Sequence, residues 1–299
     1  MPEVGASGTS AECPAGPVHW EFMTFRHAMC NEAFEGRRFA DACRAIREAG
    51  YSGIEIAPFT LAADPREITA GMRREYRDAM ASEGLTFAGL HWLMVSPKGL
   101  HLTAPDAALR ERSWGHIRNL VDLCAGLGPG GAMVLGSPRQ RSVTGGLSRE
   151  QATQYLADGL SGIGPHAAVC GVTVLLEALP ANQCDVVGTL AEAVDVVQQV
   201  ASPGVRTMFD VHNAIDETEP HDALVERYFE FIRHIHVNEL DGRHCGAGDY
   251  DFKPLLAALG RLGYTGWISL EAFDFSPGAE RLAQESLRYL EQEIARVSF

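Results

Sequence analysis

The stretch Val172-Thr-Val-Leu-Leu-Glu177-Ala-Leu decides the fold of this chain, because five apolar or β-branched residues run directly into one carboxylate. A run that apolar predicts a strand covered on both faces, as in a parallel sheet. A glutamate at the end of such a strand is costly to bury unless another group pairs with it. The stretch therefore predicts a parallel sheet and a partner for Glu177 at the end of the strand.

Three later stretches repeat this form, and each ends in a side chain that can bind a metal ion. They are Val205-Arg-Thr-Met-Phe-Asp210, Ile232-Arg-His-Ile-His236 and Trp267-Ile-Ser-Leu-Glu271. Successive ligands lie 33, 26 and 35 residues apart, about one strand and one helix, so each occupies the equivalent position on the next strand. Three carboxylates and one imidazole suit Mn²⁺, Mg²⁺ or Co²⁺ better than an ion that prefers thiolates. The sequence therefore predicts a single divalent-metal site formed by Glu177, Asp210, His236 and Glu271.

The rest of the chain alternates strands and helices without a compositional break. Eight strand–helix units in this order predict an α/β fold, a single-domain (β/α)8 TIM barrel over residues 19–299. A doubly wound open sheet also alternates, but it usually has fewer units, and no GxGxxG or GxxxxGK(S/T) motif follows an early strand. The predicted strands are 24–30, 53–58, 85–92, 132–136, 172–177, 205–210, 232–237 and 267–271. The predicted helices are 39–48, 66–82, 106–127, 189–200, 221–231, 252–262 and 279–296, with a further one from 148.

Composition excludes several classes of protein. The formal net charge of -14 argues against a nucleic-acid partner, because neutralising phosphates needs clustered Lys and Arg. No apolar run approaches the roughly 18 residues of a membrane span, so we expect no membrane partner. Seven cysteines without a CxxC pair favour free thiols in a reducing compartment, and we expect a cytoplasmic protein. Residues 1–18 are rich in Gly, Ala, Ser and Pro and lack the features of a secretory signal, so we expect a flexible N-terminal tail.

The four ligand stretches resemble those of the xylose isomerase-like superfamily of sugar isomerases and epimerases, and are most similar to the ketose 3-epimerases. The resemblance covers roughly residues 24–297. It is carried by LLEAL around Glu177, MFDVHN around Asp210, HIHVNE around His236 and ISLEAF around Glu271, together with the segments 42–56 and 246–252.

This resemblance implies an enzyme that binds one divalent ion, Mn²⁺ before Mg²⁺ or Co²⁺, and a small polyhydroxylated carbonyl substrate chelated by that ion. Glu177 and Glu271 would be both ligands and the acid/base pair, facing opposite sides of a carbon α to the carbonyl. One glutamate removes the α-proton to give an enediolate, and either glutamate returns it. Return to the opposite face gives an epimer, and transfer to the neighbouring carbon gives an isomer. The resemblance also implies a homo-oligomer, a dimer or a tetramer.

Residues that would contact the substrate are predicted less directly. His212 follows Asp210 by two residues and is expected to reach the site, although the ketose epimerases usually carry that histidine one residue later. Arg243 falls close to a sugar-contacting arginine of those enzymes. A further glutamate of the epimerases is replaced here by Asn182-Gln183, which argues against copying their substrate.

Strand ends supply further candidates. Glu55 and His91 end the second and third strands and are expected to bind hydroxyl groups, with a supporting role beneath the site as the alternative. Trp92 is expected to form a wall of the sugar site or to be a buried structural residue. Arg139 and Arg141 could hold a carboxylate or phosphate, but a solvated loop charge is the favoured interpretation.

Three other functions remain open at this point. A dehydratase of a keto-cyclitol or of dehydroshikimate would begin with the same proton abstraction and then lose a β-hydroxyl. A DNA-repair endonuclease similar to AP endonucleases needs extra His ligands, for which the chain offers only Asp241 and His244 after the seventh strand. A non-catalytic metal-binding module is the third alternative. Whether the product keeps the mass of the substrate or loses one water distinguishes the isomerase or epimerase from the dehydratase.

Overall fold

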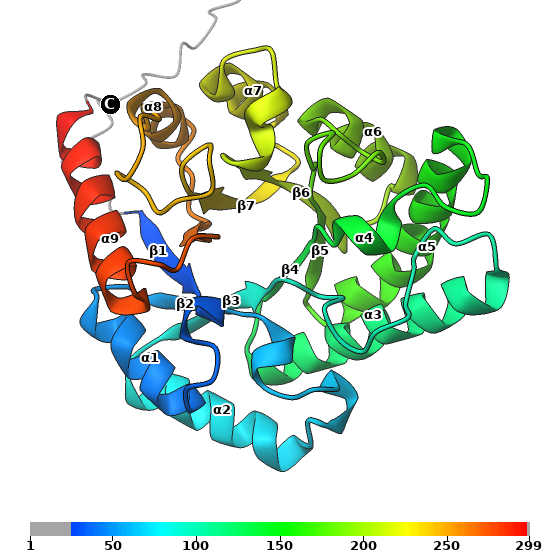
Figure 1. The fold of residues 1–299 in the computed structure, drawn as a ribbon, viewed down its shortest axis with the longest axis horizontal. Helices are drawn as coiled ribbons and strands as arrows, with labels where there is room; N and C mark the ends of the chain where they lie inside the picture. Colours follow the sequence, from blue (N-terminus) through cyan, green and yellow to red (C-terminus); the bar gives the residue numbers. More distant parts are fainter. Residues whose placement is uncertain (1–24, 298–299) are drawn as a thin grey trace, which may run out of the picture.

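The computed structural model of the protein describes residues 25–297 and has eight parallel strands closed into a barrel, with helices around the outside (Figure 1). Each strand pairs with the next in the chain, and β1 pairs with β8 to close the barrel. The predicted TIM barrel is thus confirmed. The predicted tail at residues 1–18 lies outside the described residues.

The strands lie where the apolar runs predict them: β6 and β7 have the predicted bounds, and the ends of the others differ by at most two residues. They are β1 Arg26–Cys30, β2 Gly53–Ile56, β3 Thr86–Leu90, β4 Ala132–Leu135, β5 Thr173–Leu176, β6 Val205–Asp210, β7 Ile232–Val237 and β8 Trp267–Leu270. Pairing between β3 and β4 is limited to Gly89 with Ala132 and Leu90 with Met133. Gly89 is required there, because a Cβ at this position would overlap the backbone carbonyl of Ala132.

The helices follow the predicted periodicity, and a capping side chain marks the start of four of them. They are α1 Phe39–Glu48, α2 Ala70–Ser82, α3 Ala107–Leu127, α4 Pro138–Arg141, α5 Arg149–Val169, α6 Leu190–Val200, α7 His221–Tyr228, α8 Lys253–Arg261 and α9 Ala279–Arg296. Helix α2 begins four residues later than predicted, since Pro65–Glu67 forms a separate 3-10 turn and the Thr69 side chain caps the helix at Met72. The one-turn helix α4 was not predicted.

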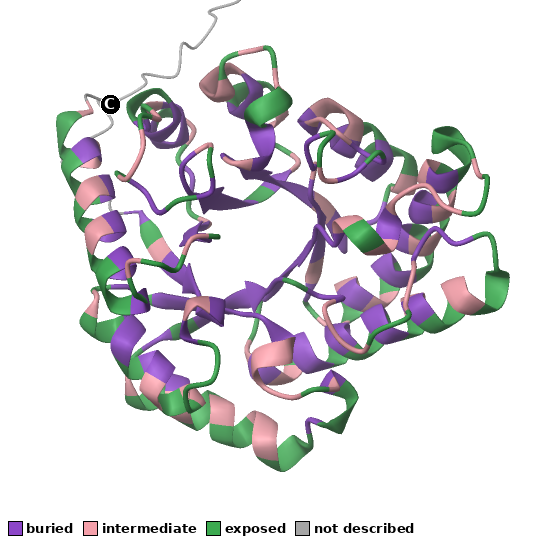
Figure 2. Cartoon of the chain, viewed as in Figure 1, coloured by how far each residue is buried: buried purple, intermediate pink, exposed green. Residues whose placement is uncertain are grey.

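The barrel strands and the inward faces of the helices form the buried core, while the outward helix faces are exposed (Figure 2). This pattern agrees with the apolar runs of β5 to β8, since strands of a barrel are covered on both sides. No helix among residues 25–297 combines the length and apolar character needed to cross a membrane. Because all eight strands point the same way, their C-terminal ends and the loops that follow them gather at one end of the barrel.

Candidate active site

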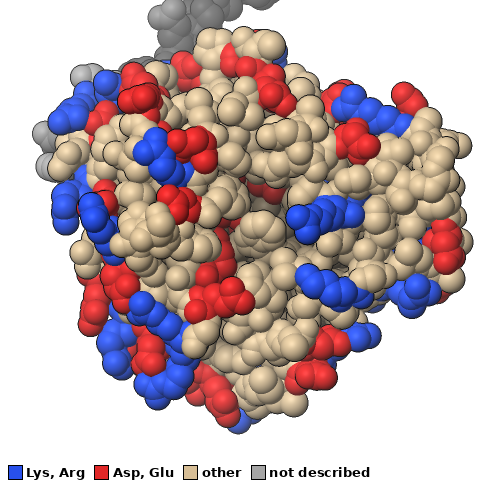
Figure 3. Space-filling view, in the orientation of Figure 1, with Lys and Arg blue, Asp and Glu red and all other residues tan. Residues whose placement is uncertain are grey.

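The four predicted metal ligands come together at the C-terminal ends of β5, β6, β7 and β8. One ligand atom from each of Glu177, Asp210, His236 and Glu271 lies within 4.8 Å of the others. The Nδ1 atom of His236 is 3.0 Å from Oε2 of Glu271 and 3.4 Å from Oδ2 of Asp210. All four side chains are buried. The barrel end is hollowed at its middle, where acidic side chains are visible (Figure 3).

The charge of this cluster fits a bound divalent ion. Burial and the neighbouring carboxylates of Asp210 and Glu271 raise the pKa of Glu177 to about 8, and burial likewise raises the pKa of Glu271. The Oδ2 atom of Asp210 is buried and has no hydrogen-bond partner among residues 25–297. A buried carboxylate oxygen without a donor is costly unless a cation faces it. The oxygen-rich donor set suits Mn²⁺, Mg²⁺ or Co²⁺.

Glu55 does not lie where a hydroxyl-binding residue is needed, which corrects the expectation drawn from its strand end. Its side chain is fully buried beneath the ligands, and Oε2 lies 2.8 Å from Nε2 of His234. Both of its oxygens are 3.1 Å from Nε2 of His236. Contact with Glu55 therefore turns Nδ1 of His236 toward the carboxylate cluster, as carboxylates behind ligating histidines commonly do.

Asn213 is a site residue that the sequence analysis missed. Its side-chain amide donates a 3.0 Å hydrogen bond to Oε1 of Glu177, and its backbone N–H donates a 2.9 Å bond to Oδ1 of Asp210. The side-chain amide of Gln183 donates in turn to Oδ1 of Asn213 at 3.0 Å. On the other side of Glu177, a Cβ at Gly136 would overlap Oε2. The Gln183–Asn213 pair and Gly136 thus fix the direction of the Glu177 carboxylate. Its place within the MFDVHN stretch around Asp210 was the available signal.

A cavity of about 40 Å³ opens onto Glu177 and Glu271. His91, expected to bind hydroxyl groups, contributes to its wall and is almost fully buried. Its Nε2 lies 2.6 Å from Oε2 of Glu32, a carboxylate that the sequence analysis did not single out. Glu32 lies in the 3-10 turn Asn31–Phe34 that follows β1. Its position just after a strand end was the signal available for it.

Two aromatic side chains stand at the mouth of this cavity. Trp92, predicted as a wall, is 37% exposed, and Phe273 is 39% exposed. Their rings meet edge to face with centroids 6.3 Å apart. The backbone of Trp92 has φ of 51°, a left-handed conformation that is rare for a bulky residue and is found mainly at functional sites.

His212 packs behind this aromatic pair. Its ring centroid lies 5.0 Å from that of Phe273, and its Nδ1–H donates a 2.7 Å bond to the Leu240 carbonyl oxygen. Its Nε2 lies 3.4 Å from the Gln183 amide nitrogen. His212 is not part of the cavity wall. It therefore lies next to the site without opening onto it.

The three arginines considered as substrate contacts are not part of the cavity wall. Arg243 is exposed and pairs with Asp241 at 2.7 Å, away from the cavity wall. Arg139 is exposed, as expected for a solvated charge, but Arg141 is fully buried and donates a 2.7 Å bond to the backbone carbonyl of Glu177. The expectation of a solvated charge was therefore wrong for Arg141, because α4 turns its side chain inward.

The pair considered as extra endonuclease ligands does not join the metal cluster. Asp241 is held by Arg243, and Nε2 of His244 lies 3.2 Å from Glu285 of α9. Neither residue belongs to the group formed by Glu177, Asp210, His236 and Glu271. Among residues 25–297 a second cluster, Cys30, Glu32, His91 and Glu271, could also hold an ion and shares Glu271 with the first, but Asp241 and His244 belong to neither cluster.

Comparison with known proteins agrees with this geometry. A family model described as a xylose isomerase-like TIM barrel matches residues 43–293. The chain is 24% identical over 255 residues to a ketose 3-epimerase of Arthrobacter globiformis, which covers 84% of this chain and 82% of that protein. Its fold matches that of a D-psicose 3-epimerase crystallised in the presence of D-fructose, with a TM-score of 0.78, 19% identity and coverage of 90% of this chain and 99% of the other.

A 3-keto-D-glucoside 4-epimerase from E. coli has the same fold, with a TM-score of 0.78, 19% identity and coverage of 90% of this chain and all of the other (100%). The resemblance to ketose 3-epimerases drawn from the ligand stretches is confirmed, and these relatives support an enzyme of the sugar isomerase and epimerase class. They support neither a dehydratase nor a DNA-repair enzyme. The chain belongs to the xylose isomerase-like TIM barrel family.

Proposed function

We propose that the protein is a divalent-metal-dependent epimerase or isomerase of a ketose or keto-sugar. The observation that carries the proposal is the pair of glutamates at the ends of β5 and β8, which share one buried cluster with Asp210 and His236 and open onto the same cavity. Strands β5 and β8 lie three steps apart around the barrel, so the two carboxylates approach a bound carbon from different sides.

The chemistry follows from what each residue can do. Glu177, Asp210, His236 and Glu271 would hold the ion, for which we propose Mn²⁺, with Mg²⁺ or Co²⁺ as alternatives. When bound, the ion polarises the substrate carbonyl and so acidifies the hydrogen on the neighbouring carbon. Glu177 or Glu271 removes that hydrogen as a proton, and the opposite glutamate or the same one returns it. The face and the carbon that receive the proton decide between epimerisation and isomerisation.

Neighbouring residues prepare these two carboxylates. Because Asn213 donates to Oε1 of Glu177, the free Oε2 atom is the one available for proton transfer beside Gly136. His91 and Trp92 form the cavity wall, and we assign them contacts with the substrate hydroxyls and its apolar face, respectively. The relatives' names offer two substrate classes, free ketoses and keto-glucosides.

Proton exchange in D₂O tests this proposal. The Mn²⁺-loaded protein is incubated with a panel of ketoses, keto-cyclitols and 3-keto sugars, and deuterium incorporation is followed by NMR and mass spectrometry. We expect deuterium at one carbon and a product with the same formula as the substrate. Loss of one water would instead identify the dehydratase reaction.

Glutamine variants assign the glutamates. Glu177→Gln and Glu271→Gln should each lower turnover by roughly 10²- to 10⁴-fold at saturating Mn²⁺ if the carboxylates act as acid and base. The exposed Glu67→Gln is the matched control and should turn over at the wild-type rate. Wild-type exchange in both metal-loaded site variants would rule out the two-glutamate mechanism.

A further inference from the structure

The catalytic cavity is too small to enclose a whole sugar derivative. Its volume of about 40 Å³ has room for only a few water molecules, each of which needs about 10–15 Å³ of such space. A substrate whose reacting carbons meet Glu177 and Glu271 must therefore extend outward through the mouth. The atoms beyond the reacting end then lie between Trp92 and Phe273, which are the aromatic members of the wall and are both partly exposed.

The aromatic pair is held in place from both sides. Trp92 lies in a left-handed backbone conformation, so the chain accepts strain to direct its ring to the mouth. The backbone N–H of Phe273 donates a 2.8 Å bond to the Gly242 carbonyl oxygen, and a Cβ at Gly242 would crowd the Phe273 ring. His212, itself fixed by Leu240, also packs against this ring, with 5.0 Å between the ring centroids. Neither ring is free to collapse over the cavity, and each keeps more than a third of its surface open.

The mouth also has a defined charge. Among residues 25–297, no Lys or Arg side chain belongs to the cavity wall, whereas Glu177 and Glu271 do. A phosphate on the substrate would find no Lys or Arg in this wall and would face two carboxylates. Aromatic faces instead favour flat apolar groups and the apolar faces of sugar rings.

Resting on the proposed function, we propose that the substrate is an uncharged keto-glycoside, whose keto-sugar ring reacts at the glutamates and whose aglycone is bound by Trp92 and Phe273. The pair therefore determines specificity for glycosides over free ketoses. This assigns to the mouth a binding site for the group attached to the sugar, separate from the residues that move the proton.

Binding measurements on the Mn²⁺-loaded protein test this inference without depending on turnover. Isothermal titration calorimetry compares phenyl 3-keto-β-D-glucopyranoside, its methyl counterpart and D-psicose. We expect the phenyl glycoside to bind about three- to tenfold more tightly than the methyl glycoside, the gain typical of one well-placed aromatic contact. Equal affinity of the wild-type protein for the two glycosides would overturn the proposal.

Two variants locate the preference, and a neighbour serves as control. Phe273→Ala removes one ring, and Trp92→Asn removes the other while keeping a residue that tolerates the left-handed backbone. Both should reduce the phenyl-to-methyl ratio to near one, and Phe273→Ala should leave D-psicose affinity unchanged. Phe275→Ala is the matched control, since Phe275 has the same 39% exposure but is not part of the cavity wall. Retention of the ratio in both site variants contradicts the assignment.

The outcomes separate the two proposals. An aglycone preference that depends on Trp92 and Phe273, without proton exchange in any substrate, would refute the proposed function and keep the glycoside site. Proton exchange in free ketoses without any aglycone preference would support the proposed function and refute the glycoside site. A wild-type dimer that becomes monomeric on Phe273→Ala, measured by light scattering, would show that the pair is a subunit contact and would also overturn the glycoside site.

Discussion

The buried carboxylate of Glu55 holds two imidazoles of one strand, His234 and His236. These histidines pull the pKa of Glu55 well below its usual range despite the opposing effect of burial, so the group stays ionised. Its negative charge in turn raises the pKa of His236. An ionised Glu55 makes His236 a more basic ligand and fixes which of its nitrogens faces the cluster.

Replacement of Glu55 should therefore weaken metal binding. Glu55→Gln keeps the shape of the side chain but removes its charge, and we expect a 10- to 100-fold lower affinity for Mn²⁺, the range typical of residues behind metal ligands. Titration of metal-free protein with Mn²⁺ followed by calorimetry measures this change. The exposed Glu67→Gln should bind Mn²⁺ as the wild-type protein does. An unchanged affinity in Glu55→Gln would contradict the orienting role.

Asn213 should affect turnover more than metal content. Asn213→Ala removes the hydrogen bond to Oε1 of Glu177, and a bond to a charged group contributes about 1.5–3 kcal/mol, or roughly a 10- to 150-fold change. We expect a fall in kcat toward this range, with KM and bound Mn²⁺ near wild-type values at saturating metal. Asn182→Ala, an exposed neighbour of Gln183, should leave kcat unchanged. Equal rates in the two variants would show that Asn213 does not position Glu177.

For single residues, the sequence predicts the ligands that recur at equivalent strand ends and misses the residues whose roles depend on one particular loop. The four ligands were predictable because each ends an apolar run at the same register, and a parallel barrel brings such ends together. Asn213, Gly136 and Glu32 were missed because their roles depend on loop geometry, which apolar periodicity does not encode. Glu55 was found, but its partners on β7 lie 179 and 181 residues away in the chain, so its direction could not be read from β2.

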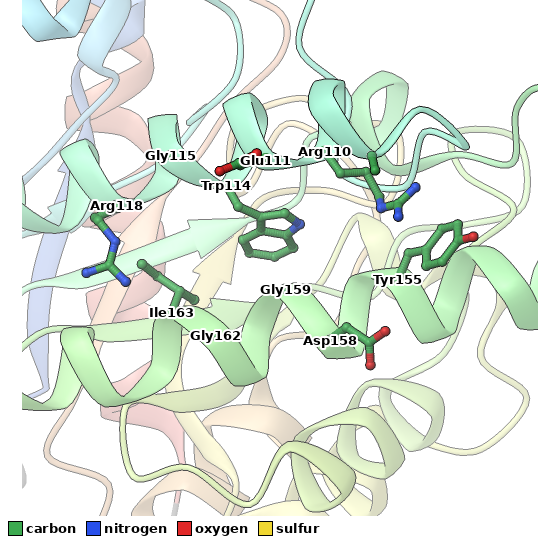
Figure 4. A pocket seen from close by; sticks show the side chains of 11 residues that line it. Arg110, Glu111, Trp114, Gly115, Arg118, Tyr155, Asp158, Gly159, Gly162 and Ile163 are labelled. Atoms are coloured by element: carbon green, nitrogen blue, oxygen red, sulfur yellow. The ribbon is translucent and has the colours of Figure 1, made fainter.

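The packing of whole elements is illustrated by α3 and α5, which meet in a shallow outer groove (Figure 4). The indole of Trp114 from α3 lies against α5 at Gly159, and the Arg110 guanidinium stacks on the Tyr155 ring with 3.8 Å between its carbon and the ring centroid. A Cβ at Gly159 would overlap the indole, whereas Gly162, one turn later, has open space around it. Only one of these two helical glycines is thus needed for packing.

Alanine at the two positions should change stability in opposite directions. Gly162→Ala should raise the free energy of unfolding by roughly 0.5–1 kcal/mol, since alanine favours the helix over glycine. Gly159→Ala carries the same helical gain but displaces Trp114, so we expect a net loss of about 1–3 kcal/mol from overpacking. Urea unfolding of both variants provides the measurement. Stabilisation by both would mean that the indole moves aside without loss of packing.

Elements were predictable from the chain to within a few residues wherever a side-chain cap or a glycine marked the boundary. Helix α1 has the predicted bounds, and Asp106 caps α3 where the helix was predicted to start. The start of α2 was misplaced because Arg66 and Glu67 are good helix formers, although Pro65 confines them to a short 3-10 turn. Helix α4 was missed because four residues are too few to show a period.

Over the whole molecule, the buried carboxylates link stability to pH. The pKa of Glu177 rises from 4.5 to about 8 on folding in the absence of metal. Below pH about 4.5 both states hold the proton, so the group contributes nothing to the dependence. Between about 4.5 and 8 the unfolded carboxyl ionises while the folded one keeps its proton, and stability therefore falls as pH rises. Above about 8 this contribution levels off.

Metal should reverse this trend. The ion binds the deprotonated site of the native state, so saturating Mn²⁺ should stabilise the protein increasingly as pH rises and should release protons on binding near pH 7. Urea unfolding from pH 5 to 9, with EDTA or with Mn²⁺, measures both slopes. In Glu177→Gln with EDTA, the decline between pH 5 and 8 should be smaller. A decline of wild-type size in that variant would place the titrating group elsewhere.

Two further predictions concern the complete chain. Deleting residues 1–17 should leave the melting temperature nearly unchanged, because their composition favours a segment that buries no core. A large decrease would show that the segment packs on the barrel. Light scattering of the same two proteins reports whether the expected dimer or tetramer forms and whether the segment contributes to it.

The pairing of β1 with β8 has a consequence for how the protein is made. Arg26 to Met29 bond to Trp267 to Leu270, so the first strand has only one of its two neighbours until the last has left the ribosome. At a synthesis rate of about 5–20 residues per second, this wait is on the order of ten to fifty seconds. During that time one edge of β1 has unpaired backbone groups, to which a strand of another nascent chain can bind. Slowing translation between β1 and β8 should therefore lower the yield of active enzyme, through aggregation before the barrel closes.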